Sequence, residues 1–62
     1  MFYEVVVDSK IYKSDIGRKC EALKLAEQQW LSRNYKSVDV FRKYPETDRT
    51  PSHTEIIYLR IK

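Results

Sequence analysis

The alternation of hydrophobic and polar positions predicts three β-strands in this chain of 62 residues. Residues 1–8 contain Phe-Tyr-Glu-Val-Val-Val-Asp, a β-branched and aromatic run that is typical of a strand and ends in the polar, turn-like residues 8–10. Residues 35–44 and 54–62 alternate with period 2 and predict the other two strands. Pro45 ends the earlier of these two, because proline lacks the N–H that a sheet needs.

The residues between the first two strands have the pattern of a helix. Ser14 and Asp15 are residue types that cap helices, and strong helix formers fill 21–29, so we expect a helix from Ile16 to about Leu31. At about 100° per residue, its hydrophobic arc is wider than packing on one sheet requires. The arc comprises Ile16, Cys20, Ala22, Leu23, Leu25, Ala26, Trp30 and Leu31. Two interpretations stay open: an ordinary exposed leucine, or a helix flank at Leu25 that another chain covers.

The order of these elements predicts one small α+β domain over residues 1–62. We expect a β-α-β-β two-layer sandwich, with one helix packed on a three-stranded, mainly antiparallel sheet. In the expected strand order, 54–62 lies between the other two strands, so that every neighbour is antiparallel. The polar segment 45–53 is long for a hairpin connection and is expected to be a mobile loop.

A single helix leaves one face of this sheet open, and the period of the strands predicts which residues lie on it. We expect Val5, Val7, Val38, Val40, Ile57 and Leu59 to face the helix. The opposite, open face is then expected to carry Phe2, Val6, Tyr35, Phe41, Ile56 and Tyr58, with Lys43, Arg60 and Lys62 alongside.

Two uses of the open face follow from its aromatic and basic residues. Protein interfaces are enriched in such residues, which favours a partner protein or a second copy bound through Tyr35, Phe41, Tyr58 and Arg60, with Leu25 on the helix. The alternative is single-stranded nucleic acid, whose bases would stack on the aromatics while Lys43 and Lys62 contact phosphates. The first use is our preferred hypothesis, a non-enzymatic binding protein that acts as a homodimer or docks on a host protein.

Composition supports the need for a partner. A chain of this length buries only about 60% of its unfolded surface, so its own core is marginal. One cysteine cannot form an internal disulfide, and Cys20 with His53 cannot supply the four ligands of a structural zinc. Association with another chain remains as a source of buried area.

The net charge of +3 is concentrated in the segments 10–19 and 33–43 and in the last three residues. Lys10 and Lys13, close to the expected start of the helix, are candidate phosphate contacts. A solvated turn is the favoured interpretation, because the chain has one glycine and no glycine-rich phosphate loop.

Catalytic chemistry is not indicated by the sequence. Cys20 is expected to be a packed, inert thiol and His53 a surface residue, and the carboxylates show no metal-binding spacing. We therefore expect no enzyme, no metal and no cofactor. No apolar run could cross a bilayer and no signal-peptide pattern is present, so we expect a cytoplasmic protein that does not contact membranes.

The heptapeptide Glu-Ala-Leu-Lys-Leu-Ala-Glu at 21–27, followed by an aromatic residue and a basic strand, resembles the helix-to-strand segment of several small phage proteins. One of these binds and inhibits host RNA polymerase. The resemblance covers less than half of the chain. It implies a class of very small, non-enzymatic proteins of phage or mobile-element origin that act by occupying a surface of something larger.

Overall fold

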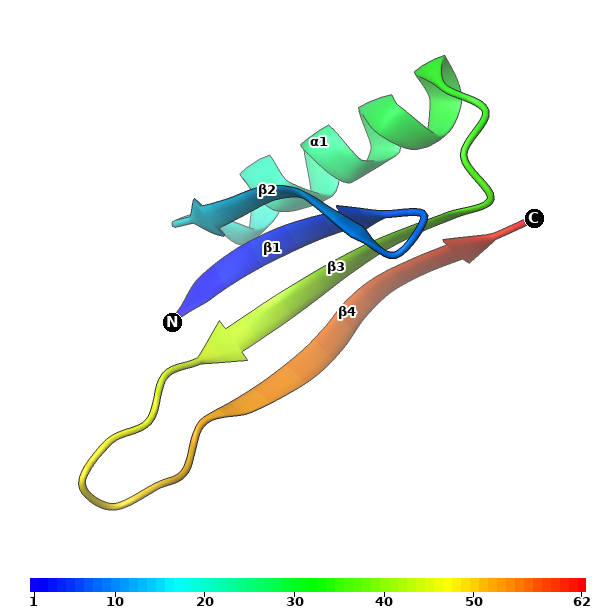
Figure 1. Ribbon diagram of the computed structural model, residues 1–62. Helices are drawn as coiled ribbons and strands as arrows, with labels where there is room; N and C mark the ends of the chain where they lie inside the picture. The colour runs from blue at the N-terminus through cyan, green and yellow to red at the C-terminus, as the bar shows by residue number, and fades with distance from the viewer.

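The protein, described over all 62 residues by a computed structural model, packs one helix on one face of a four-stranded antiparallel sheet (Figure 1). The sheet has the strand order β2-β1-β3-β4. The elements are β1 (Phe2–Val7), β2 (Lys10–Ile16), α1 (Lys19–Ser32), β3 (Ser37–Tyr44) and β4 (His53–Ile61). The α+β class is confirmed, whereas the expected three-stranded β-α-β-β arrangement is wrong because β2 forms an additional strand.

β2 forms because the polar residues after β1 make a two-residue hairpin turn. Asp8 and Ser9 have φ angles of 48° and 67°, the left-handed conformation that such a turn requires at both positions. Val7 and Lys10 are paired on either side of it. The hairpin reverses the chain before the helix, so β1 lies antiparallel to β3 and beside it. The expectation that β4 lies between these two strands is therefore wrong, and β4 is an edge strand.

The side chain of Asp8 ties this hairpin to the beginning of β3. Its Oδ1 accepts hydrogen bonds from the backbone N–H groups of Lys36 at 2.7 Å and Ser37 at 3.1 Å. The Asp8 N–H in turn donates to the carbonyl of Ser37 at 3.0 Å. One residue thus supports both the turn and the junction between the two hairpins.

The helix begins at Lys19, later than expected, because the predicted capping residues belong to β2. Ser14 donates its hydroxyl hydrogen bond to Glu4 on the neighbouring strand, at 2.9 Å. Arg18 occupies the N-cap position without a side-chain hydrogen bond. Cys20 lies in the first helical turn and is exposed, so the expectation of a packed thiol is wrong.

The core lies between the helix and the middle of the sheet. It consists of Tyr3, Val5, Val7, Ile16, Ala22, Ala26, Val38 and Val40. Ala22 and Ala26 are one helical turn apart and fully buried, and their small side chains allow the helix backbone to lie close to the sheet. The largest fully buried side chains are valines, so the core is small even for this length.

β3 and β4 continue as a hairpin arm beyond the part of the sheet that the helix covers (Figure 1). At its tip, Thr47 and Thr50 join in a turn in which the Thr47 N–H donates to the Thr50 carbonyl at 2.9 Å. His53 belongs to β4 rather than to the loop, and its ring stacks on Tyr44 with centroids 4.2 Å apart. The mobility of 45–53 stays a prediction. The 14-residue helix is too short to cross a bilayer.

Candidate protein interface

A β-bulge in β4 decides which side chains reach the open face of the sheet. Phe41 is paired with Ile56, but the next residue of β3 towards its start, Val40, is paired with Tyr58, so Ile57 is one extra residue. After the bulge, each residue of β4 lies on the face of the sheet opposite to the one that continuous alternation would give it. Because Val40 is buried against the helix, its partner Tyr58 lies on the helix side, and Leu59 lies on the open side.

Because of the bulge, four residues of β4 lie on the face of the sheet opposite to the one that strict alternation predicts. Tyr58 and Arg60 were expected on the open face, but they pair with the core residues Val40 and Val38 and lie on the helix side. Leu59 was expected in the core and lies on the open side, opposite Asp39. Ile61, two residues further along, lies on the open side as well, opposite Ser37.

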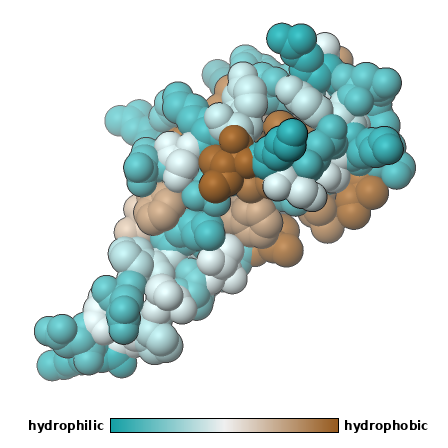
Figure 2. All heavy atoms as spheres, in the orientation of Figure 1, coloured by the Kyte–Doolittle hydropathy of each residue, from teal (hydrophilic) through white to brown (hydrophobic).

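The open face is therefore more aliphatic and less aromatic than expected. Its uncovered hydrophobic residues are Ile11 (64% exposed), Ile56 (60%), Leu59 (53%) and Ile61 (68%), beside the less exposed Phe2, Val6 and Phe41. Figure 2 shows hydrophobic residues gathered over the middle of the sheet and along β4 towards the C-terminus, whereas the tip of the hairpin arm is hydrophilic. We call the side chains of Ile11, Phe41, Ile56, Leu59 and Ile61 the open-face patch, at whose base the buried Val6 lies. An uncovered group of this kind is typical of an interaction surface.

Asp39 is a carboxylate set within this patch. It lies opposite Val6 on one neighbouring strand and Leu59 on the other. One carboxylate oxygen, Oδ1, is buried and has no hydrogen-bond partner. Desolvation by these neighbours raises the pKa of Asp39 above its ordinary value of 3.8. The patch therefore offers one acceptor that the chain itself does not satisfy.

A second carboxylate on the open face, Glu4, is neutralised within the chain. It accepts the Ser14 hydroxyl and lies 3.8 Å from the Lys43 ammonium. Lys43 also lies 6.0 Å from the centre of the Phe41 ring. Glu4 is nevertheless buried, which shows how closely the side chains of β1, β2 and β3 pack on this side of the sheet.

The candidate phosphate contacts do not gather on one face. Lys43 lies on the open face beside Glu4, while Lys62 lies 5.6 Å from the Trp30 ring and hydrogen-bonds Asn34. Lys10 and Lys13 were expected in a loop before the helix, which is wrong, because both are residues of β2.

The candidate partner-binding residues do not all lie on one face of the sheet either. Phe41 lies on the open face, as expected, opposite Glu4 on β1. Tyr35 and Tyr58 were expected there too, but both pack against the core on the helix side. Leu25 also packs against the core and is not an uncovered flank of the helix, whereas Leu31 is 76% exposed.

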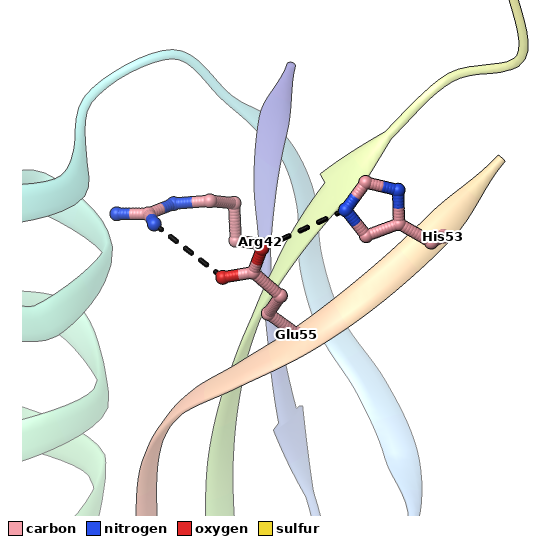
Figure 3. Close-up of polar contacts among 3 residues, drawn as sticks. All are labelled: Arg42, His53 and Glu55. Atoms are coloured by element: carbon pink, nitrogen blue, oxygen red, sulfur yellow. Dashed lines mark ion pairs between the residues drawn. The ribbon is translucent and has the colours of Figure 1, made fainter. Parts of the chain in front are cut away.

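A polar cluster lies on the helix side of the sheet, where the hairpin arm begins (Figure 3). Glu55 lies between Arg42 and His53, with its carboxylate 3.6 Å from the Arg42 guanidinium and 3.6 Å from His53 Nε2. Arg42 lies 5.6 Å from the centre of the Tyr3 ring. The contacts with Tyr3 and then Tyr44 raise the pKa of Arg42, so this side chain stays charged. The cluster joins β3 and β4 where the arm begins.

His53 and Cys20, the two reactive side chains that the sequence offers, lie on different elements. His53 has a carboxylate neighbour but lies in β4, while Cys20 lies in the first turn of the helix. Cys20 lines a shallow depression together with Arg18, Glu21 and Lys24. No three His, Cys, Asp or Glu side chains lie together as a metal site would require.

Sequence reasoning missed Ile11, Leu59, Ile61 and Asp39 as residues of the open face. The signal for β2 was the pair Asp8-Ser9, which can make a two-residue turn. The signal for the bulge was the run Ile-Ile-Tyr-Leu at 56–59, in which no polar residue fixes the alternation. Nothing in the sequence alone places Asp39 between two hydrophobic neighbours.

Comparisons of the chain with protein-family models, with curated proteins and with solved structures found no match.

Proposed function

We propose that this protein is a small, non-enzymatic binding protein whose open-face patch docks on another protein. The observation that carries the proposal is the one-sided cover of the sheet. The helix buries the side that holds Val5 and Val40, while Ile56, Leu59 and Ile61 on the other side are more than half exposed. Covering these side chains would remove apolar area from water, which stabilises a complex by about 25 cal/mol per Å² before the entropic cost of association.

The chemistry of the patch indicates what the partner surface must offer. The exposed side chains of Ile11, Ile56 and Leu59 favour aliphatic or aromatic side chains on the partner. Asp39 adds a requirement, because a partner that covers its unpaired oxygen without a donor would bury a charge at high cost. A lysine, an arginine or a backbone N–H group of the partner, placed opposite Asp39, would donate a hydrogen bond to this oxygen. We therefore propose a protein partner with a hydrophobic surface and one such donor.

The alternative, single-stranded nucleic acid, is less well supported. Phosphates need several cations on the surface that binds the bases. On the open face Lys43 is already beside Glu4, and Asp39 adds negative charge. Arg60 and the aromatic Tyr58 lie on the helix side.

The proposed docking agrees with the expectation of a cytoplasmic, partner-binding protein of phage or mobile-element origin. The origin rests on the resemblance of the helix segment 21–27 and stays a prediction. A free, exposed Cys20 suits a reducing compartment.

The test is affinity capture from the cells that produce the protein, with the captured proteins identified by mass spectrometry. The variant Ile56→Ser with Leu59→Ser removes two exposed residues of the patch, and Leu31→Ser removes an equally exposed leucine of the helix. We expect one partner to be retained by the wild type and by Leu31→Ser and lost by the double variant.

Two results would contradict the proposal. One is a partner that the double variant retains as well as the wild type does. The other is a captured species that nuclease treatment removes and that binds short oligonucleotides with a steep salt dependence, which would favour the nucleic-acid alternative.

A further inference from the structure

β4 is an edge strand with an unprotected edge. Its nine residues contain no proline, and it is exposed along most of its length. The opposite edge strand, β2, is irregular: it carries Lys10 and Lys13, two shifts in register and a residue, Asp15, with a φ of 56°. Charges and bulges of this kind protect an edge from pairing with other chains. β4 has one bulge and no lysine.

The backbone groups that β4 directs to its free edge can be identified from its neighbours. The Lys62 N–H donates to the Lys36 carbonyl, and the Ser37 carbonyl accepts from Asp8 on the β1 side. Backbone groups alternate along a strand, so every second residue of β3 points towards β4, starting from Val38. The remaining residues of β3 point towards β1. The residues of β4 opposite them therefore direct their N–H and C=O groups away from β3, to the free edge of the sheet. They are Thr54, Ile56, Leu59 and Ile61.

We propose that β4 pairs along this edge with β4 of a second copy of the chain, antiparallel, about a two-fold axis between Ile57 and Tyr58. In this register Ile56 lies opposite Leu59 of the second copy, and Thr54 opposite its Ile61. All four are outward-pointing residues with side chains on the open face. Each such pair exchanges two backbone hydrogen bonds, which continues the sheet across the axis.

The bulge places Glu55 and Arg60 on the same side of β4, as this register requires. Without a bulge at Ile57, residues 55 and 60 would lie on opposite faces of the strand, because their separation of five is odd. With it, Glu55 lies opposite Arg42 and Arg60 opposite Val38, both on the helix side. Each copy brings the same extra residue to the axis, so the segments between Ile56 and Leu59 of the two chains keep equal length.

Charge favours a second copy as the occupant. The register places Glu55 of each chain opposite Arg60 of the other, which gives two attractive cross-strand pairs. Arg60 makes no ion pair within its own chain, so it is free to do so. Registers centred on Glu55 or on Arg60 would set like charges opposite each other and are disfavoured. The register centred between Ile57 and Tyr58 pairs residues 54–61 of both chains and sets opposite charges across from each other.

The test is sedimentation equilibrium of the wild type, of R60E, of E55K and of an equimolar mixture of the two variants, with circular dichroism as the check on folding. We expect the wild type to dimerise and each variant alone to associate about tenfold or more weakly, because like charges then face each other twice. The mixture should recover the dimer, since positions 55 and 60 of an R60E chain then face opposite charges at positions 60 and 55 of an E55K chain. If the variants were weak dimers only because they fold less stably, mixing them would not restore the dimer. Recovery in the mixture would therefore show that the charge pairs are responsible.

Amide hydrogen exchange locates the contact independently. In the wild type, the amides of Ile56, Leu59 and Ile61 should exchange more slowly as the protein concentration rises, and in R60E they should not. A wild type that stays monomeric at millimolar concentration overturns the proposal, and so does a dimer in which these amides exchange at the monomer's rate. A mixture that does not recover the dimer overturns it as well. Glu55 and Arg60 lie on the helix side, so R60E and E55K leave the side chains of the open-face patch unchanged.

Discussion

Asp39 lies opposite Leu59 across the ladder of β3 and β4, so a carboxylate and a half-exposed leucine share the open face of the sheet. On its other side Asp39 lies opposite Val6. The pair shows the effect of the bulge at Ile57, which brings a hydrophobic side chain next to a charge that nothing in the chain compensates.

Replacing Asp39 with asparagine should stabilise the protein at neutral pH. Desolvation raises the pKa of Asp39 in the folded state, so the charged form destabilises the fold as the pH rises above the ordinary value of 3.8. Asp39→Asn removes that charge, and we expect a higher free energy of unfolding than that of the wild type at pH 7 by urea denaturation. The gain should shrink as the pH falls towards 3.8 and vanish below it.

Asp48→Asn is the matched control, because Asp48 is exposed in the loop between β3 and β4. Asp48→Asn should leave the free energy of unfolding unchanged at pH 7 and also at a pH near the ordinary value of 3.8. Equal stability of Asp39→Asn and the wild type at pH 7 would show that the carboxylate is well solvated.

The bulge itself is tested by two substitutions that strict alternation would predict to be similar. Val40→Ala removes two methyl groups from a fully buried side chain and should cost about 2 kcal/mol of unfolding free energy. Leu59→Ala removes more hydrocarbon from a side chain that is more than half exposed, so we expect a loss below about 1 kcal/mol. Chemical denaturation measures both. If Leu59→Ala costs as much as Val40→Ala, Leu59 belongs to the core and the register is wrong.

Much of the fold was predictable from periodicity, because it depends on local patterns. β1 at Phe2–Val7 lies within the strand predicted over 1–8, and Ala22 and Ala26 lie on the predicted buried face of the helix. β2 was not predictable from alternation, because Lys-Ile-Tyr-Lys-Ser-Asp-Ile over 10–16 has too few hydrophobic residues at period 2. Pairing with β1 and the turn at Asp8 make it a strand.

The candidate site was predictable only in part, because faces depend on register. Phe41 and Ile56 lie on the open face, as alternation predicts. Tyr58 and Arg60 do not, because one inserted residue reverses every face beyond it. Tyr35 precedes β3, so the period of that strand does not apply to it, and its ring packs against the core.

Asp8 should contribute more to stability than an ordinary surface residue. Asp8→Ala removes the acceptor for the Lys36 and Ser37 N–H groups and places alanine at a φ of 48°. We expect a loss of about 1 to 3 kcal/mol in the free energy of unfolding, since both effects act at one position. Thermal and urea denaturation measure it.

Asp8→Asn is the informative companion, because asparagine keeps an acceptor oxygen and tolerates the left-handed conformation. It should recover most of the stability that Asp8→Ala loses. An Asp8→Ala protein as stable as the wild type would mean that the hairpin does not depend on this contact.

Photocrosslinking tests the central claim, that the open-face patch binds a protein, most directly. A photoreactive phenylalanine analogue is placed at position 59 in one sample and at position 31 in another, and the adducts formed in the producing cells are identified by mass spectrometry. Both positions are exposed leucines, one on the open face and the other on the helix. We predict a protein adduct at position 59 that is absent at position 31. Adducts at position 31 alone, or a nucleic-acid adduct at position 59, would contradict the claim.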